Sequence, residues 1–237
     1  MDREKLISYS FYYSGEYDKI INAINKNEEV PIFSIANAIT IIDQEYPKCL
    51  FNLKYPPLVL YYKGDLDLLK EEAISIVGSR NACEYALNAT KALVQKNNDK
   101  VIISGLAKGI DACAHTYANK TIGILGCGID YIYPECNRDL IKKVSKEGLI
   151  ISEYPTFSKP LGYHFPFRNR IIACLSDTVY VMQSNLKSGT MTTINEALEL
   201  GKEVRVLPYS VFDENGINNN HLIYEGALMI ENEEIAF

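Results

Sequence analysis

From residue 73 onward, short apolar runs alternate with longer helix-like segments. The runs are nearly continuous in Val and Ile, which is typical of parallel strands buried on both faces. Because few residues separate strands from helices, we expect right-handed crossovers and a doubly wound sheet. We therefore predict an α/β fold, an extended Rossmann-like arrangement around a mostly parallel sheet. The expected strands are 73–78, 100–105, 120–126, 148–153, 178–183 and 202–208, and the expected helices are 82–97, 109–119, 138–148, 168–177 and 190–202.

The first part of the chain has a different pattern. We predict that residues 1–45 form a short N-terminal helical extension and that residues 46–237 form the Rossmann-like domain. Prolines and tyrosines in residues 46–69 exclude a long helix there. Within that stretch, "PLVLYYKG" (57–64) is expected to supply a strand.

Composition limits the class of ligand. The hydrophobic content of 47% is ample for a core, and the net charge of −6 argues against a diffusely basic nucleic-acid coat. Anion binding is therefore left to a local patch. The six cysteines have neither CxxC nor zinc-like spacing, the opening residues are polar, and no apolar run reaches membrane-spanning length. We expect a cytoplasmic protein with no membrane association, no metal and no cofactor.

Candidate chemistry gathers after the expected strands, because ligands of such sheets bind outside the carboxyl ends of the strands. Glycine and serine recur there, and their backbone amides can face an anion beside a helix N-terminus. An ordinary nucleotide cofactor is not expected: the chain has no GxxxxGK[ST], and its GxG at 126–128 lacks the third glycine. Glycines that only permit tight turns are the alternative. The candidates for phosphate binding are Gly78, Ser79, Ser104, Gly105, Gly109, Ser188, Gly189 and Thr190.

Four basic residues are expected near the same edge of the sheet. Arg80 follows the strand 73–78, and Lys108 follows the strand 100–105. Arg168 and Arg170, with Asn169 between them, open an expected helix, where their charges oppose the helix dipole. Two cations at a helix start indicate a bound anion that compensates them. A solvated surface side chain is the alternative for Arg80 or Lys108 taken singly.

The segment before these arginines, 153–170, is rich in aromatic residues, and Pro155, Pro160 and Pro166 are expected to keep it extended. Aromatic rings interleaved with guanidinium groups are typical of proteins that bind single-stranded nucleic acid, through base stacking and phosphate contacts. Phe165 is the candidate stacking residue. The alternative is that Phe165 or Phe167 anchors the loop in the core.

Catalytic constellations are sparse in this sequence. His115 lies four residues after Asp111 in an expected helix, so the two side chains can share a face. We expect a hydrogen bond between them that orders the loop, not one that transfers protons. Nothing pairs Asp130 or Glu153, and no cysteine has a positioned base. We therefore predict that the protein is not an enzyme.

Taken together, several stretches resemble the DNA-processing protein A (DprA, also called Smf) family. They are "IVGSRNACEYA", "IISGLAKGIDACAH", "TIGILGCGIDYIYPECN", "LIISEYP", "HFPFRNRIIACLSD", "SGTMTTINEALELGKEV" and "NNNHLIYEGALMI". The resemblance implies an extended Rossmann fold that binds single-stranded DNA, forms a homodimer and helps load a RecA-type recombinase in natural transformation, without catalysis. It also assigns Arg80 to the GSR motif, Lys108 to a basic position, and Arg168 and Arg170 to the RNR pair.

The sequence departs from the family pattern at Met182 and Gln183, where a glutamate is common, and at Tyr209, where a glycine commonly follows proline. An alternative function is a nucleotide-binding sensor or a nucleoside-monophosphate phosphoribohydrolase, whose glycine-rich helix start is similar to "SGTMTTINEALELGK". In those enzymes Gly-Gly precedes Gly-Thr and a glutamate follows soon after. Here Gly189-Thr190 is preceded by Leu186, Lys187 and Ser188, and Glu196 comes too late. A third alternative is a dimeric scaffold that uses residues 221–230 as its interface.

Overall fold

The structure is a computed structural model that describes residues 2–235. Its strands form one sheet in the order β1-β2-β6-β5-β4-β3-β7-β8-β9. The strands are β1 (Ala38–Thr40), β2 (Val59–Gly64), β3 (Ala73–Gly78), β4 (Val101–Ser104), β5 (Lys120–Leu125), β6 (Leu149–Ser152), β7 (Thr178–Gln183), β8 (Glu203–Val206) and β9 (Leu228–Met229). The helices are α1 (Arg3–Tyr12), α2 (Tyr17–Asn25), α3 (Glu84–Lys96), α4 (Ile110–Tyr117), α5 (Arg138–Glu147), α6 (His164–Cys174), α7 (Gly189–Glu199), α8 (Ile217–Tyr224) and α9 (Asn232–Ile235). Short 3₁₀ helices occupy Lys48–Asn52, Leu66–Lys70, Glu135–Asn137 and Glu214–Gly216.

The strands from β3 to β9 pair in parallel, which confirms the doubly wound, mostly parallel sheet. The chain runs outward from β3 through β4, β5 and β6, and then returns to the other side of β3 to form β7, β8 and β9. The topological switch point therefore lies between β3 and β7. This is the place where open α/β sheets bind their ligands.

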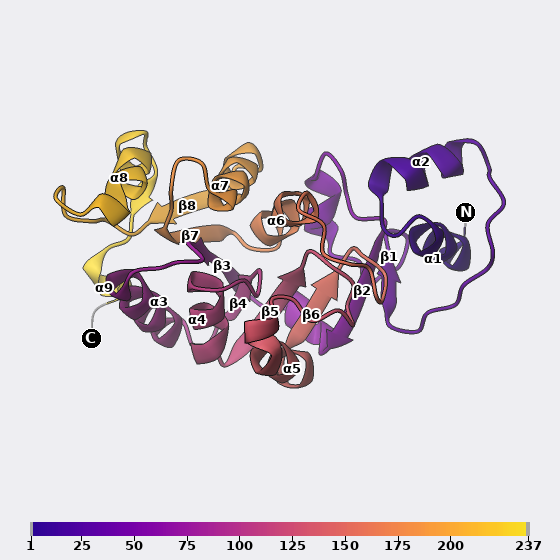
Figure 1. Cartoon of the computed structure of the whole chain (residues 1–237), viewed down its shortest axis with the longest axis horizontal. Helices are drawn as coiled ribbons and strands as arrows, with labels where there is room; N and C mark the ends of the chain where they lie inside the picture. The colour runs from indigo at the N-terminus through magenta and orange to yellow at the C-terminus, as the bar shows by residue number, and fades with distance from the viewer. Residues whose placement is uncertain (1, 236–237) are drawn as a thin grey trace.

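Helices cover both faces of this sheet, as Figure 1 shows. On one face, Ile74 and Ile76 of β3 pack with residues of α3 and α4. On the other face, Val77 of β3 packs with residues of α6 and α7. Successive residues of a strand point to opposite faces, so a strand covered on both sides must be apolar throughout. This requirement explains why continuous Val and Ile runs located the strands correctly.

The N-terminal helices lie at the β1 end of the sheet, as Figure 1 shows, and bury residues such as Leu6 and Ile20 against β2. The expected strand at 57–64 forms β2, which pairs antiparallel with β6. β1 pairs antiparallel with β2, so the sheet includes residues that precede Tyr46. The division of the chain at residue 45 stays a prediction.

Helix α6 begins four residues before the expected position, because the segment around Pro166 is helical and not extended. Pro166 is the third residue of α6, within the first turn. Backbone N–H groups in the first turn have no intrahelical partner, so a proline there costs no hydrogen bond. The expectation that Pro166 keeps this segment extended is therefore wrong.

None of the helices within residues 2–235 combines the length and the apolar character needed to cross a bilayer.

Candidate functional site

A cavity of about 500 Å³, here called the rim pocket, opens at the topological switch point. Its walls are the residues after β3, the first turns of α6 and the start of α7. The structure brings together most of the residues that the sequence marked as candidates. The candidates that line the pocket are Gly78, Ser79, Arg80, Phe165, Arg168, Asn169, Ser188, Gly189 and Thr190.

Arg80 and Phe165 form a cation–aromatic pair in the rim pocket, in which Arg80 is exposed and Phe165 is half-buried. The Arg80 guanidinium carbon lies 5.6 Å from the centre of the Phe165 ring. That ring is in turn 5.3 Å from the ring of Tyr133, which also lines the pocket. Arg80 is exposed and forms no ion pair with any residue in the range 2–235. Its charge is therefore free to meet a ligand, next to a ring that offers a stacking surface.

Arg168 lies in the wall of the rim pocket and is only 4% exposed. Its Nη1 donates to the Gly105 carbonyl at 2.9 Å and to the Ile124 carbonyl, and its Nε donates to Asn169 Oδ1 at 2.8 Å. Burial lowers the pKa of the Arg168 guanidinium, and the nearby Asp111 carboxylate opposes that change. An arginine stays protonated in proteins. Arg168 therefore places a fixed positive charge in the wall of the rim pocket, where it donates hydrogen bonds to backbone carbonyls.

The start of α7 adds hydrogen-bond donors to the same cavity. Ser188 is the N-cap residue of α7, yet its side chain makes no capping hydrogen bond. Its Oγ is buried and has no hydrogen-bond partner among the residues that the structure describes. The first N–H groups of a helix lack intrahelical partners, and the helix dipole favours an anion there. Ser188 Oγ and the N-terminus of α7 therefore suit a phosphate oxygen.

The loop "SGLAKGID" does not offer the expected phosphate cradle. Asp111 Oδ2 accepts hydrogen bonds from the backbone N–H groups of Gly105 (3.1 Å) and Ala107 (3.2 Å). Ser104 Oγ donates to the Ile76 carbonyl instead of facing the pocket. A carboxylate from the chain itself thus occupies these donors. The expectation that Ser104 and Gly105 hold a phosphate is therefore wrong.

Gly109 and Lys108 also lie outside the rim pocket. Gly109 has a φ of +73°, and a Cβ there would lie 2.2 Å from the Ser79 carbonyl oxygen. Only glycine permits this close approach, by which the Ile110 N–H donates to the Ser79 carbonyl at 3.2 Å. Gly109 thus fixes the neighbouring backbone and does not line the cavity. Lys108 is exposed beside it and is not among the lining residues.

Asp111 and His115 do not form the expected hydrogen bond. His115 Nδ1 lies 2.6 Å from Thr121 Oγ1, and that hydroxyl donates to the Ile102 carbonyl. Because the hydroxyl proton is used there, His115 must donate from Nδ1–H, which fixes its tautomer. Burial lowers the pKa of His115 to about 3. Asp111 orders the loop without help from His115, which is a neutral core residue.

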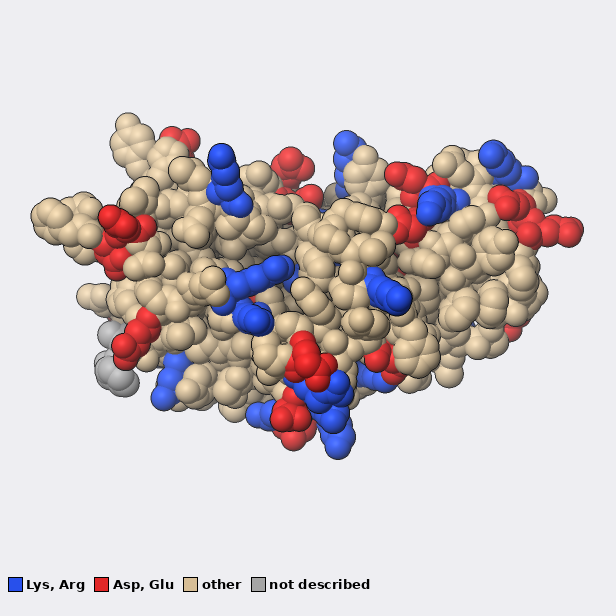
Figure 2. All heavy atoms as spheres, viewed as in Figure 1, with Lys and Arg blue, Asp and Glu red and all other residues tan. Residues whose placement is uncertain are grey.

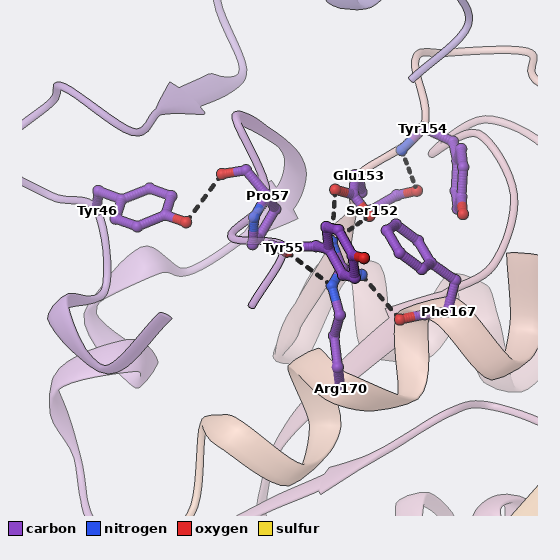
Figure 3. A network of polar contacts seen from close by, with 8 residues as sticks. All are labelled: Tyr46, Tyr55, Pro57, Ser152, Glu153, Tyr154, Phe167 and Arg170. Atoms are coloured by element: carbon purple, nitrogen blue, oxygen red, sulfur yellow. Dashed lines mark hydrogen bonds and ion pairs between the residues drawn. The ribbon is translucent and has the colours of Figure 1, made fainter. Parts of the chain in front are cut away.

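Arg170 points away from the rim pocket, contrary to expectation. It is 3% exposed, and its Nη2 donates to both carboxylate oxygens of Glu153, at 2.7 and 2.9 Å. Its Nε donates to the Tyr55 carbonyl and its Nη1 to the Phe167 carbonyl, both at 2.8 Å, as Figure 3 shows. A helix turns by about 100° per residue, so residues two apart project to opposite sides. Arg168 and Arg170 therefore cannot bind one anion.

Two acids that the sequence left unpaired have partners in the structure. Glu153 is paired with Arg170; burial raises the pKa of its carboxyl group, and Arg170 opposes that rise. Asp130 forms an ion pair with Lys63 of β2. These partners lie far away in the sequence, so no local pattern could indicate them.

Several polar residues of the rim pocket escaped the sequence analysis. Thr193 lies one turn after Gly189 in α7, so helical spacing could have indicated it. Asn185 belongs to the loop between β7 and α7, and Asn81 follows Arg80. No regular spacing marks a loop residue as facing a cavity. Within residues 2–235, no group of three His, Cys, Asp or Glu side chains could hold a metal ion.

The surface charge fits a local cationic patch. Figure 2 shows basic side chains near the middle of one face, over the region between α4 and α6. The chain as a whole carries a net charge of −6.

Comparisons with known proteins agree on one family. The family model described as DNA recombination-mediator protein A matches residues 37–236. The chain is 39% identical over 198 residues to DNA processing protein DprA of Streptococcus pneumoniae, covering 81% of this chain and 70% of that protein. It is 41% identical over 208 residues to DprA of Bacillus subtilis, covering 85% of this chain and 70% of that protein.

Two solved structures are similar over most of the chain. The X-ray structure of DprA from Streptococcus pneumoniae has a TM-score of 0.82 at 31% identity and covers 98% of this chain and 94% of that one. A structure of DNA processing protein A from Helicobacter pylori, which concerns its single-stranded DNA binding mode, has a TM-score of 0.74 at 35% identity. It covers 82% of this chain and 91% of that one.

Proposed function

The chain belongs to the DNA recombination-mediator protein A family, and we propose that its rim pocket binds single-stranded DNA without catalysing a reaction. The observation that carries this proposal is that exposed Arg80 and half-buried Phe165 form a pair that lines the same cavity as the N-terminus of α7. A phosphate would bind Arg80 and the Ser188 end of α7, and a base would stack on Phe165. The single-stranded DNA binding of the Helicobacter pylori relative supports the same ligand class.

Salt dependence of the affinity tests this proposal. Of the four basic residues predicted from the sequence, Arg80 and Arg168 in the rim pocket and Lys108 outside it remain for the DNA, because Glu153 neutralises Arg170. Neutralising about 2–3 phosphates of a single strand gives a slope of about −1.4 to −2 in a plot of log K against log salt. Fluorescence anisotropy with labelled oligo-dT at several salt concentrations measures that slope. Affinity that does not change with salt would contradict the proposal.

Single substitutions separate the contribution of the Arg80 charge to DNA binding from that of base stacking on Phe165. Arg80→Ala should weaken binding and make the slope shallower by about 0.7, since one phosphate contact is lost. Phe165→Leu keeps an apolar side chain but should cost about 1–3 kcal/mol of binding free energy with the slope unchanged. Arg138→Ala is the matched control, because Arg138 is exposed on α5 and pairs with Glu135. Equal losses in Arg80→Ala and Arg138→Ala would contradict the assignment.

We further propose that the protein forms a homodimer through apolar residues near its C-terminus. Phe212 is 92% exposed and Tyr224 is 86% exposed. β9, close to Tyr224 in the sequence, is the edge strand of the sheet within the described residues. Exposed apolar patches on soluble proteins mark interaction surfaces, and a self-complementary patch yields a two-fold dimer. Light scattering should give twice the chain mass for the native protein and the mass of one chain for Tyr224→Glu. Tyr12→Glu is the matched control, because it changes an exposed tyrosine of α1 and should leave the dimer intact.

We propose that the bound strand is passed to a RecA-type recombinase during DNA recombination or natural transformation, which is consistent with the family's description as a recombination mediator. The protein should accelerate the single-strand-dependent ATPase of a RecA-type recombinase on DNA covered by single-strand-binding protein. Arg80→Ala should abolish the acceleration. An equal rate with and without the native protein would contradict this role.

The alternative of a nucleoside-monophosphate phosphoribohydrolase requires a free carboxylate at the pocket. Asp111 is the carboxylate among the described lining residues, and Gly105 and Ala107 donate hydrogen bonds to its Oδ2. Incubation with nucleoside monophosphates and chromatography for free base tests this alternative. Robust base release would replace the binding proposal with an enzymatic one.

A further inference from the structure

A second cavity, of about 440 Å³, lies on the other side of the first turns of α6 and is here called the aromatic pocket. It opens where the start of α2, the segment between Asn52 and β2 that contains Tyr55, and the segment before α6 meet. The rim pocket uses Phe165 and Arg168 of α6, whereas the aromatic pocket uses Tyr163 and Phe167. The aromatic pocket is lined by Gly15, Glu16, Tyr17, Asp18, Tyr55, Tyr154, Tyr163 and Phe167.

Rings from separate segments make up most of this lining. The Tyr17 and Tyr55 rings meet edge to face with centres 5.4 Å apart, and Tyr55 lies 6.1 Å from Phe167. Figure 3 shows the rings of Tyr55, Phe167 and Tyr154 next to the Glu153–Arg170 pair. Tyr55 is 37% exposed and Tyr163 is 58% exposed, so aromatic surface remains open to a ligand.

Two of these rings already hold a cation of the chain itself. The Arg170 guanidinium carbon lies 3.7 Å from the centre of the Phe167 ring, and Lys54 Nζ lies 5.3 Å from the centre of the Tyr55 ring. The negative face of an aromatic ring attracts ammonium and guanidinium groups. Aromatic rings of this pocket therefore already form cation–aromatic contacts within the protein.

The charges of the lining residues are exclusively acidic. Glu16 Oε1 accepts from the Tyr163 hydroxyl at 2.6 Å and lies 3.4 Å from His164 Nε2. Asp18, in the first turn of α2, is exposed and has no ion-pair partner within residues 2–235. Arg170, under the Phe167 ring, does not offset these charges because Glu153 neutralises it, and Lys54 is exposed and is not part of the lining. A phosphate would be repelled here, which distinguishes this pocket from the rim pocket.

We propose that the aromatic pocket binds an aliphatic cation that carries an ammonium or guanidinium group. The head group lies against the Tyr55 and Phe167 rings, and the carboxylates of Glu16 and Asp18 neutralise it. A free polyamine and an arginine or lysine side chain of another protein offer this same chemistry. The volume accommodates such a head with its aliphatic stem.

Isothermal titration of the full chain tests this inference. The probes are agmatine, spermidine and the peptide acetyl-Ala-Arg-Ala-amide, with butylurea as a neutral planar control. Agmatine should bind and butylurea should not. Tighter binding of the peptide than of agmatine would identify a protein side chain as the ligand source, and tighter binding of spermidine would identify a free polyamine.

Variants locate the binding. Asp18→Asn and Tyr55→Leu should each weaken cation binding about tenfold. Their matched controls are Asp139→Asn, an exposed acid in the first turn of α5, and Tyr117→Leu, an exposed tyrosine outside both pockets. Both controls should bind agmatine as the native chain does. Arg80→Ala should also bind agmatine normally, so the two pockets are tested separately.

Three results would overturn the inference. One is that none of the three cations binds. Another is that butylurea binds as tightly as agmatine, which would make charge irrelevant. The third is that Asp18→Asn loses no more affinity than Asp139→Asn.

Discussion

The buried ion pair between Glu153 and Arg170 allows a direct test of whether Arg170 stabilises the fold, whereas Arg168 lines the rim pocket. Glu153 is 4% exposed and Arg170 is 3% exposed, and the guanidinium donates to both carboxylate oxygens. Glu153→Gln keeps the shape of the side chain but removes its charge. The Arg170 guanidinium then stays buried with a full charge, and only neutral acceptors face it: the new amide oxygen and the carbonyls of Tyr55 and Phe167.

Breaking a buried pair by removing one partner costs about 3–5 kcal/mol of unfolding free energy, since the remaining charge is uncompensated. A domain of this size loses about 2–4 °C in Tm per kcal/mol. Glu153→Gln should therefore lower Tm by about 6–20 °C. The double variant Glu153→Leu with Arg170→Met removes both charges and should lose less than the sum of the single variants.

Thermal unfolding followed by circular dichroism measures these shifts. The matched control is Glu135→Gln, because Glu135 and Arg138 form an ion pair with side chains that are 71% and 46% exposed. Such surface pairs contribute about 0–1 kcal/mol, so Tm should move by no more than a few degrees. Equal shifts in Glu153→Gln and Glu135→Gln would refute the reasoning.

DNA binding provides a second readout. If Arg170 is structural, Glu153→Gln should leave the affinity for oligo-dT unchanged at a temperature where the variant is folded. If Arg170 instead contacts a phosphate, releasing it from Glu153 should tighten binding and steepen the salt slope. That second outcome would restore Arg170 to the DNA site.

Three further predictions concern the core beside the rim pocket. In Gly105→Ala, the new Cβ would lie 2.3 Å from Arg168 Nη2, so we expect a loss of about 1–3 kcal/mol in a urea titration together with weaker oligo-dT binding; unchanged affinity would show that Arg168 does not contribute to the site. Gly109→Ala places a Cβ against the Ser79 carbonyl at a positive φ, and a Tm equal to that of the native chain would contradict the expected loss of several degrees. Burial holds the pKa of His115 at about 3 in the folded state, whereas an unfolded imidazole titrates near 6.5, so the unfolded state binds the extra proton below about pH 6.5. Stability should then fall by about 2 kcal/mol between pH 7 and pH 5, and this part of the fall should vanish in His115→Asn, as urea titrations at the two pH values can check.

The sequence predicted the central sheet well for a specific reason. A strand with helices on both faces must be apolar at every position, so runs such as 73–78 and 178–183 stand out from the amphipathic helices between them. The alternation of strands and helices also predicted the edge at which the rim pocket lies, because such sheets bind ligands outside the carboxyl ends of their strands. The sequence therefore predicted Arg80, Phe165 and Ser188 near one edge of the sheet, and in the structure all three line one cavity.

The sequence could not predict which polar groups are already occupied within the protein. Asp111 lies only six residues from Gly105, yet nothing in the pattern shows that its carboxylate accepts from the loop that was expected to hold phosphate. The partner of Arg170 directly follows β6, and the aromatic pocket joins rings from α2, from the segment before β2 and from α6. Such contacts depend on distant segments meeting in space.

Arg168 and Arg170 show which features the sequence determined and which the tertiary structure decided. The sequence by itself determined that a cationic, aromatic segment follows β6 and lies at the edge of the sheet. Only the tertiary structure decided where α6 begins, and with each residue turning the helix by about 100°, that start sets the direction of every side chain. Beginning at His164, α6 directs Arg168 to the rim pocket and Arg170 to Glu153, because packing against the rest of the fold, and not the local sequence, fixes the rotation of the helix.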